Sequence, residues 1–133
     1  MSKNIGANAV SLPTIQDNEG KKNDDGKLRY DLVPVEAHEA MAQVFTYGAT
    51  KYGDNNWQNV DSNRYLAALF RHLNAWRKGE KMDSESGLSH LKHALTNVAI
   101  LVYKEQEDFD KEMEEMYQHF LKEKKIKEET IEG

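Results

Sequence analysis

The sequence predicts an all-α protein, a small bundle of helices. Apolar side chains recur every three or four residues through most of the chain from Val35 to Leu121, which is typical of helices with one buried face. The alternation of apolar and polar residues that indicates a strand is absent, except briefly near Leu28 to Val33. With 133 residues, the chain has room for one domain of ordinary size.

The first helix is expected to begin at Pro34 and to run to about Ala49. Proline suits the first helical turn because its missing N–H costs nothing there, and Glu36 favours the positive end of the helix. The sequence YGATKYGDNNW, residues 47–57, then predicts a break at Gly48 and Gly53. The apolar stripe of this helix consists of Val35, Met41, Val44 and Phe45.

A second helix is predicted after a cap at Asp61 or Ser62, with an end near Gly79. The acidic loop EKMDSESG, residues 80–87, connects it to a third helix. The apolar positions of the second helix are Leu66, Leu69, Leu73 and Trp76, and those of the third are Leu88, Leu91, Leu95, Val98 and Val102.

From Glu105 the chain is highly charged but keeps a helical period, so a last helix is expected, either separate from the third or continuous with it. We therefore predict a flexible arm at 1–24, a helical core at 25–104, a charged helix at 105–125 and a frayed tail at 126–133. The apolar stripe of the last helix consists of Phe109, Met113, Met116, Phe120 and Leu121.

Composition excludes several classes of protein. The chain has no cysteine, which removes disulfides, thiolate metal sites and cysteine nucleophiles. It has no apolar run long enough to span a membrane, and its start lacks the apolar core of a secretory signal. A net charge of −5 argues against general binding of duplex nucleic acid, which needs a cationic surface. These features predict a soluble cytoplasmic protein.

The stretch HLKHALTN places His90, His93 and Asn97 within an arc of about 60° on a helix, nearly opposite the leucine face. Such a row is either a hydrogen-bonded or exposed polar network, or a metal or catalytic site, since imidazoles three residues apart can share one metal ion. Both interpretations are open. The polar partners expected from neighbouring helices are Glu36, Glu39, Arg71 and His72.

Glu36 and Glu39 lie three residues apart on the first helix. Carboxylates at this spacing can bind a hard cation together, although any acidic helix start shows the same pattern.

Aromatic and cationic residues gather around the first helix and could hold a nucleotide. Aromatic rings stack on bases, lysine and arginine neutralise phosphates, and asparagine amides can read a purine edge. The alternative for the aromatic residues is ordinary packing at a helix end. The candidate nucleotide-binding residues are Lys27, Arg29, Tyr30, Tyr47, Lys51, Tyr52, Asn56, Trp57 and Arg71.

Two segments carry a family resemblance: DDGKLRYDLVPVEAHEAMAQVFTYGATKYGDNNW and RYLAALFRHLNAWRKGEKMDSESGLSHLKHALTNVAILV, together about residues 24–103. They resemble a phage-rich family labelled dATP/dGTP diphosphohydrolase, N-terminal domain. That resemblance implies a MazG-like all-α fold, usually in homo-oligomers, which splits a nucleoside triphosphate into monophosphate and pyrophosphate. It also implies a divalent metal, Mg²⁺ or Mn²⁺, held by carboxylates in two motifs.

The resemblance implies that Glu36 and Glu39 form the first metal motif, with His72, His90 or His93 as further ligands or a general base. At the second motif this sequence departs from the family, because it offers His90, His93 and Asn97 in place of carboxylates. The candidate catalytic residues are Glu36, Glu39, His72 and His93, and the candidate metal ligands are Glu36, Glu39, His90, His93 and Asn97.

Three functions remain open. The first is hydrolysis of a (deoxy)purine nucleoside triphosphate by a phage enzyme acting in the infected cell. The second is a binding module on the same bundle, which captures a nucleotide signal of host defence without turning it over; the loss of carboxylates at the second motif favours it. The third is a helical adaptor whose charged helix binds another protein.

Overall fold

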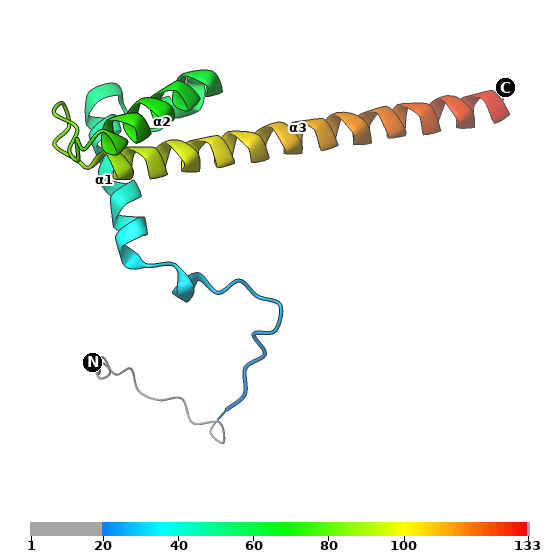
Figure 1. The fold of residues 1–133 in the computed structure, drawn as a ribbon. Coiled ribbons are helices and arrows are strands. Elements are labelled where there is room, and N and C mark those ends of the chain that lie inside the picture. Colours follow the sequence, from blue (N-terminus) through cyan, green and yellow to red (C-terminus); the bar gives the residue numbers. More distant parts are fainter. Residues whose placement is uncertain (1–19, 133) are drawn as a thin grey trace. The chain divides into compact units, whose positions relative to one another are not determined.

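The computed structural model describes residues 20–132 and confirms the predicted all-α class. Within these residues the structure has three α-helices, two short 3₁₀ turns and no strand beyond an isolated bridge between Met82 and Ser89 (Figure 1). None of the described helices is both long and apolar enough to cross a membrane. The chain divides into two units, Met1–Leu32 and Val33–Gly133, which are described separately.

In the first unit, a turn places the Lys27 N–H 3.0 Å from the Asp24 carbonyl oxygen, and a 3₁₀ turn follows at Tyr30–Leu32. The Arg29 guanidinium donates two hydrogen bonds to the Asp31 carboxylate, at 2.9 and 2.8 Å. Residues 20–24 are irregular and exposed, and the rest of the predicted arm at 1–24 lies outside the described residues.

Helix α1, Val35–Tyr52, begins after Pro34 as predicted but runs three residues beyond Ala49. Gly48 lies inside this helix, so the break predicted there is wrong. Glycine inside a helix costs only about 1 kcal/mol relative to alanine, which neighbouring turns can offset. The helix ends at Gly53, whose positive φ of 94° suits glycine and whose N–H donates to the Ala49 carbonyl oxygen at 2.8 Å.

Helix α2, Ser62–Arg77, follows a 3₁₀ turn at Asn56–Asn59 and starts at the predicted cap. The Asp61 carboxylate accepts a hydrogen bond from the Asn63 N–H at 3.0 Å, which satisfies one of the free donors of the first turn. Helix α2 packs against the first half of α3, and α1 also packs on α3 (Figure 1).

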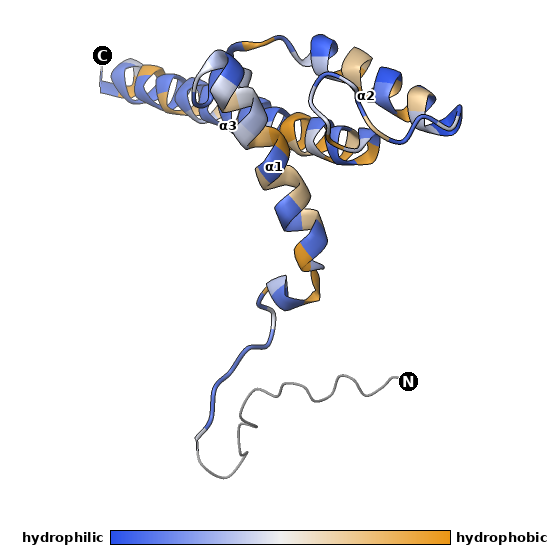
Figure 2. Cartoon of the chain, turned by 90° about the vertical axis from the view of Figure 1, so that its left-hand side faces the viewer, coloured by the Kyte–Doolittle hydropathy of each residue, from blue (hydrophilic) through white to orange (hydrophobic). Residues whose placement is uncertain are grey.

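Helix α3, His90–Glu132, is one continuous helix of 43 residues. It begins two residues after Leu88 and includes most of the tail at 126–133 that we expected to fray. No glycine or proline interrupts the sequence from 90 to 132, which explains its length. Its second half extends past α1 and α2 (Figure 1) and carries apolar bands between hydrophilic ones (Figure 2).

The buried face of α3 is the polar one. The apolar positions on the opposite side of this helix are exposed instead, since Leu91, Leu95, Val98 and Val102 are 38–59% exposed. The small side chains of Ala94 and Thr96 let neighbouring elements approach the polar face, where polar partners satisfy the histidines. The buried residues of α3 are His90, His93, Ala94, Thr96, Asn97 and Ile100.

Candidate functional site

Three histidines meet where the end of α2 lies against the start of α3. The Nδ1 atoms of His72 and His90 are 2.8 Å apart. The ring of His72 stacks on that of His93, with centroids 4.5 Å apart and planes 7° apart. His90 and His93 are only 5% and 8% exposed, so this cluster belongs to the interior of the helical unit.

The loop between α2 and α3 supplies the polar partners of the histidines. His90 Nε2 lies 2.6 Å from Glu80 Oε2, and His93 Nε2 lies 2.6 Å from Ser86 Oγ. The Asp83 carboxylate is 3.8 Å from the same nitrogen of His93. Backbone hydrogen bonds order the loop: the His90 N–H at the start of α3 donates to the Lys81 carbonyl oxygen, and the Asp83 N–H donates to the carbonyl oxygen of Leu88, just before α3.

This arrangement does not form a serine–histidine–aspartate triad. The Leu88 N–H donates to Ser86 Oγ at 3.1 Å, and the same oxygen lies 2.6 Å from His93 Nε2. Asp83 faces that same nitrogen, whereas a triad needs the carboxylate on the other ring nitrogen to orient the base. Nucleophilic catalysis by Ser86 is therefore not the chemistry that this geometry supports.

Burial sets the charge of the cluster. Desolvation, reinforced by the neighbouring histidines, lowers the pKa of His72, and desolvation also lowers the pKa of His93 against the opposing pull of Asp83. Burial alone would raise the pKa of Asp83, but hydrogen bonds from Ser86 and the nearby imidazoles hold it below its ordinary value. At neutral pH the imidazoles of His72 and His93 are therefore neutral beside the ionised carboxylate of Asp83.

A cleft of about 560 Å³ opens beside this cluster, between the second half of α1, the 3₁₀ turn at Asn56–Asn59 and α3. Tyr47 connects the two features, because its ring meets the His93 ring edge-on at 6.2 Å and both residues line the cleft. The other aromatic and polar residues that line it are Phe45, Thr46, Tyr52, Asp54, Asn55, Asn56, Trp57, Tyr65, Thr96 and Asn97.

Four of the predicted nucleotide-binding residues line this cleft: Tyr47, Tyr52, Asn56 and Trp57. Trp57 also has the packing role that we considered as its alternative, since its ring lies 5.4 Å from that of Phe45 and 4.9 Å from that of Tyr103.

Lys51 lies next to the cleft-lining tyrosines. Its ammonium is 5.8 Å from the ring centre of Tyr47 and 5.2 Å from that of Tyr52. It also pairs with the Glu85 carboxylate at 2.5 Å, and this contact raises the pKa of Lys51.

The remaining cationic candidates do not line the cleft. Arg71 is exposed and forms no ion pair with any described residue. Lys27, Arg29 and Tyr30 belong to the other unit, where all three are exposed. Their role in holding phosphates stays a prediction.

The carboxylates beside the histidines differ from the predicted ones. Glu36 and Glu39 are exposed, contact no histidine of the cluster and line no described cavity. Glu36 precedes Tyr47 by eleven residues, about 16 Å of helix rise. Asn97 lines the cleft, while His90 and His93 lie in the cluster with His72.

Sequence reasoning missed Glu80, Asp83 and Ser86 as partners of the histidines. We interpreted EKMDSESG only as a connecting loop, although its three acidic residues, Glu80, Asp83 and Glu85, lie within about ten residues of His90. Acidic residues so close in sequence to a histidine pair are the signal that could have found them.

The chain matches known proteins over this region. The family described as dATP/dGTP diphosphohydrolase, N-terminal, matches residues 17–115. A protein of Salmonella phage PMBT28 named dATP/dGTP diphosphohydrolase is 34% identical over 84 residues, which cover 63% of this chain and 29% of that protein. The matched region is thus less than a third of the length of the phage protein. No solved structure matches the chain.

Proposed function

Because the chain belongs to the dATP/dGTP diphosphohydrolase, N-terminal family, we propose that it binds a (deoxy)purine nucleoside triphosphate and hydrolyses it to monophosphate and pyrophosphate. The observation that carries the proposal is the aromatic cleft with His93 in its wall. Its volume of about 560 Å³ lies within the range of small-molecule sites.

The cleft has the groups that a purine needs. The rings of Tyr47 and Tyr52 offer faces on which a base can stack, and base–aromatic stacking is sequence-tolerant but strong. The amides of Asn55, Asn56 and Asn97 each carry donors and an acceptor that can pair with the edge of a base.

Phosphates would extend toward Lys51, whose ammonium lies next to the two tyrosines. Asp54 also lines the cleft. Its carboxylate and the phosphate oxygens of the ligand are the kind of oxygen donors that Mg²⁺ or Mn²⁺ prefers, and such an ion would neutralise the phosphates. His93 is the group that would accept a proton from the attacking water.

A binding module without turnover is the second candidate. Asp54 is the one carboxylate among the residues that line the cleft, whereas metal-dependent phosphoryl chemistry usually employs several. In addition, the matched region covers only 29% of the phage relative, so that protein has much sequence outside the shared part. Under this alternative the chain captures a nucleotide and releases it intact.

We also propose that the protein is a homo-oligomer that joins through α3. The helix carries an exposed apolar stripe of Phe109, Met113, Met116 and Phe120. The simplest partner for this stripe is the same stripe on a second copy of the chain, because a two-fold axis pairs identical surfaces.

Incubation with each deoxynucleoside and ribonucleoside triphosphate, with Mg²⁺ or Mn²⁺, tests the proposal through pyrophosphate release. We expect release from purine substrates, a loss of at least a hundredfold in His93→Gln, and unchanged release in His38→Gln, which alters an exposed histidine of α1. Calorimetry separates the alternatives: binding with intact nucleotide recovered supports the module, and no binding of any nucleotide contradicts both.

A further inference from the structure

We propose that His72, Asp83 and His90 form a binding site for a transition-metal ion such as Zn²⁺ or Co²⁺, at the junction of α2, the 80–87 loop and α3. One ligand atom from each of these residues lies within 4.8 Å of the other two. Two imidazoles and one carboxylate are a donor set that first-row transition metals favour, and the same set leaves coordination positions open.

The hydrogen bond of His90 to Glu80 points to a metal ligand. His90 is 5% exposed, and its Nε2 lies 2.6 Å from the Glu80 carboxylate. A carboxylate accepts only, so Nε2 donates its N–H to Glu80, and Nδ1 is the nitrogen that faces His72. A histidine that donates one N–H to a carboxylate while presenting the other nitrogen is the usual support for a metal-ligating imidazole.

His72 presents its nitrogen to the same point. Its Nδ1 lies 2.8 Å from that of His90, which in the absence of metal is one N–H···N hydrogen bond. Two nitrogens bound to one tetrahedral ion, at bonds of about 2.0–2.1 Å, stand about 3.3 Å apart. A separation of the two rings by about half an ångström would therefore admit the ion.

Asp83 completes the set from the loop. Its carboxylate accepts a hydrogen bond from the Ser86 N–H at 2.9 Å, which orients it, and its second oxygen can turn to the ion. The loop is tied to the start of α3 by the hydrogen bond of His90 N–H to Lys81, and the hydrogen bond of Asp83 N–H to Leu88 closes the loop itself. Such preorganisation lowers the cost of gathering the ligands.

The site is separate from Glu36, Glu39 and Asp54, and it does not depend on nucleotide hydrolysis. The stacked ring of His93 lies on His72 and also lines the cleft. An ion held by His72, Asp83 and His90 would thus be separated from a nucleotide in the cleft by the imidazole of His93.

The test is a titration of chelator-treated full-length protein with Co²⁺ and, separately, Zn²⁺, without nucleotide. We expect one equivalent per chain, visible Co²⁺ absorption typical of nitrogen and oxygen ligands, and a higher melting temperature with Zn²⁺. His90→Ala should remove the binding, and Glu80→Gln should weaken it by 10-fold to 100-fold because it disturbs only the supporting hydrogen bond. His38→Ala and His119→Ala, which alter exposed histidines, should bind normally.

The absence of stoichiometric binding, or binding that His90→Ala and Asp83→Asn leave unchanged, would overturn the proposal. Asp83→Asn serves as a second variant in case His90→Ala does not fold, since it keeps the size of the side chain. Circular dichroism shows whether each variant is folded. If the protein binds Co²⁺ or Zn²⁺ but releases no pyrophosphate, the metal site is supported and the proposed hydrolysis is contradicted. If it releases pyrophosphate with Mg²⁺ but binds neither Co²⁺ nor Zn²⁺, only the metal site is contradicted.

Discussion

Lys51 of α1 and Glu85 of the loop before α3 form an ion pair across 34 positions of sequence. The ammonium also lies over the rings of Tyr47 and Tyr52 at one edge of the aromatic cleft. Both partners of the pair are exposed, so the pair itself adds little to stability. Its consequence lies in binding, because Glu85 competes with any anionic ligand for the same cation.

Substitutions at the two residues should change nucleotide affinity in opposite directions. Glu85→Gln frees Lys51 and should tighten binding by up to about fivefold, and Lys51→Met should weaken it by a similar factor, since an exposed pair contributes up to about 1 kcal/mol. Both effects should shrink at high salt. Calorimetry of a purine triphosphate measures them.

Glu107→Gln is the matched control for Glu85→Gln, because it removes the same charge from an exposed position of α3 outside the cleft. Equal tightening in both variants would attribute the effect to net charge. It would contradict a specific role for Lys51.

The sequence allowed correct prediction of those features that local chemistry determines. A cap was expected at Asp61 or Ser62 because a side-chain oxygen before an apolar period satisfies free N–H groups, and Asp61 does so. The continuity of α3 was left open, since charge density alone does not end a helix. The break expected at Gly48 failed because tertiary contacts override a weak local preference.

Which face of a helix is buried depends on partners that periodicity does not reveal. The leucine face of α3 is the more apolar one, but the histidine face has the hydrogen-bond partners Glu80 and Ser86. These partners come from a loop, and the helical period of the sequence does not predict the conformation of a loop. The same limitation hid the pairing of Lys51 with Glu85.

Ile100 should matter for stability far more than other apolar residues of α3. It is 5% exposed and also lines the cleft, so Ile100→Ala should lower the free energy of unfolding by about 2–5 kcal/mol. Ile131→Ala removes the same atoms at a position 84% exposed, and it should stay within about 0.5 kcal/mol of the unaltered protein. Urea denaturation followed by circular dichroism compares the two. Similar costs would mean that Ile131 is buried in solution.

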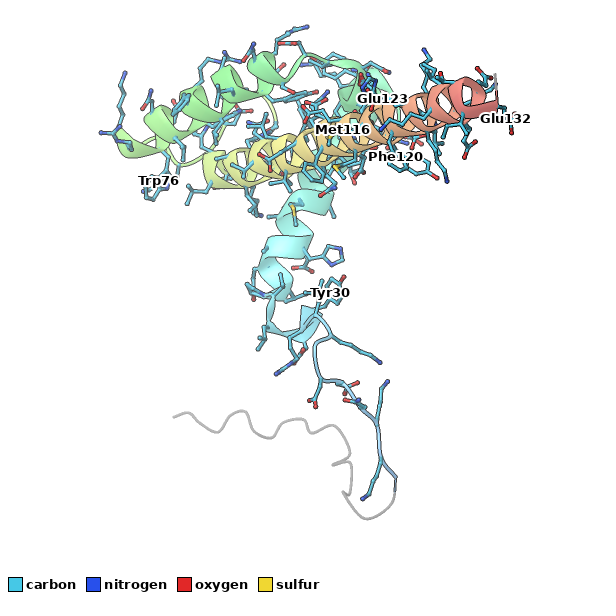
Figure 3. The ribbon with its side chains drawn as sticks, turned by 90° about the vertical axis from the view of Figure 1, so that its right-hand side faces the viewer. Tyr30, Trp76, Met116, Phe120, Glu123 and Glu132 are labelled. Carbon is cyan, nitrogen blue, oxygen red and sulfur yellow. The ribbon has the colours of Figure 1, made fainter. Side chains whose placement is uncertain are left out.

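The apolar stripe of α3 should mediate self-association. Phe109, Met113, Met116 and Phe120 follow one another at intervals of four, three and four residues and are 49–64% exposed. This spacing is typical of a coiled-coil seam. Figure 3 labels two of them, Met116 and Phe120, on the stretch of α3 beyond the other helices.

A lysine in the seam should break the assembly. Met116→Lys should shift the mass measured by light scattering toward that of one chain, because a buried ammonium is costly. Gln118→Lys adds the same side chain on the opposite side of the helix, about 180° away from Phe109, and should leave the mass unchanged. An unaltered protein that is already monomeric at micromolar concentration would contradict the prediction.

The two tryptophans report separately on the cleft. Trp57 lines it, whereas Trp76 lies at the end of α2, with the Lys81 ammonium 4.6 Å from its ring centre (Figure 3). A purine that stacks in the cleft should change the emission of Trp57, so Trp76→Phe protein should respond to nucleotide and Trp57→Phe protein should not. A response confined to Trp57→Phe protein would place the ligand near the end of α2 instead. Because Trp57 also packs on Phe45 and Tyr103, circular dichroism of Trp57→Phe must first match that of the unaltered protein.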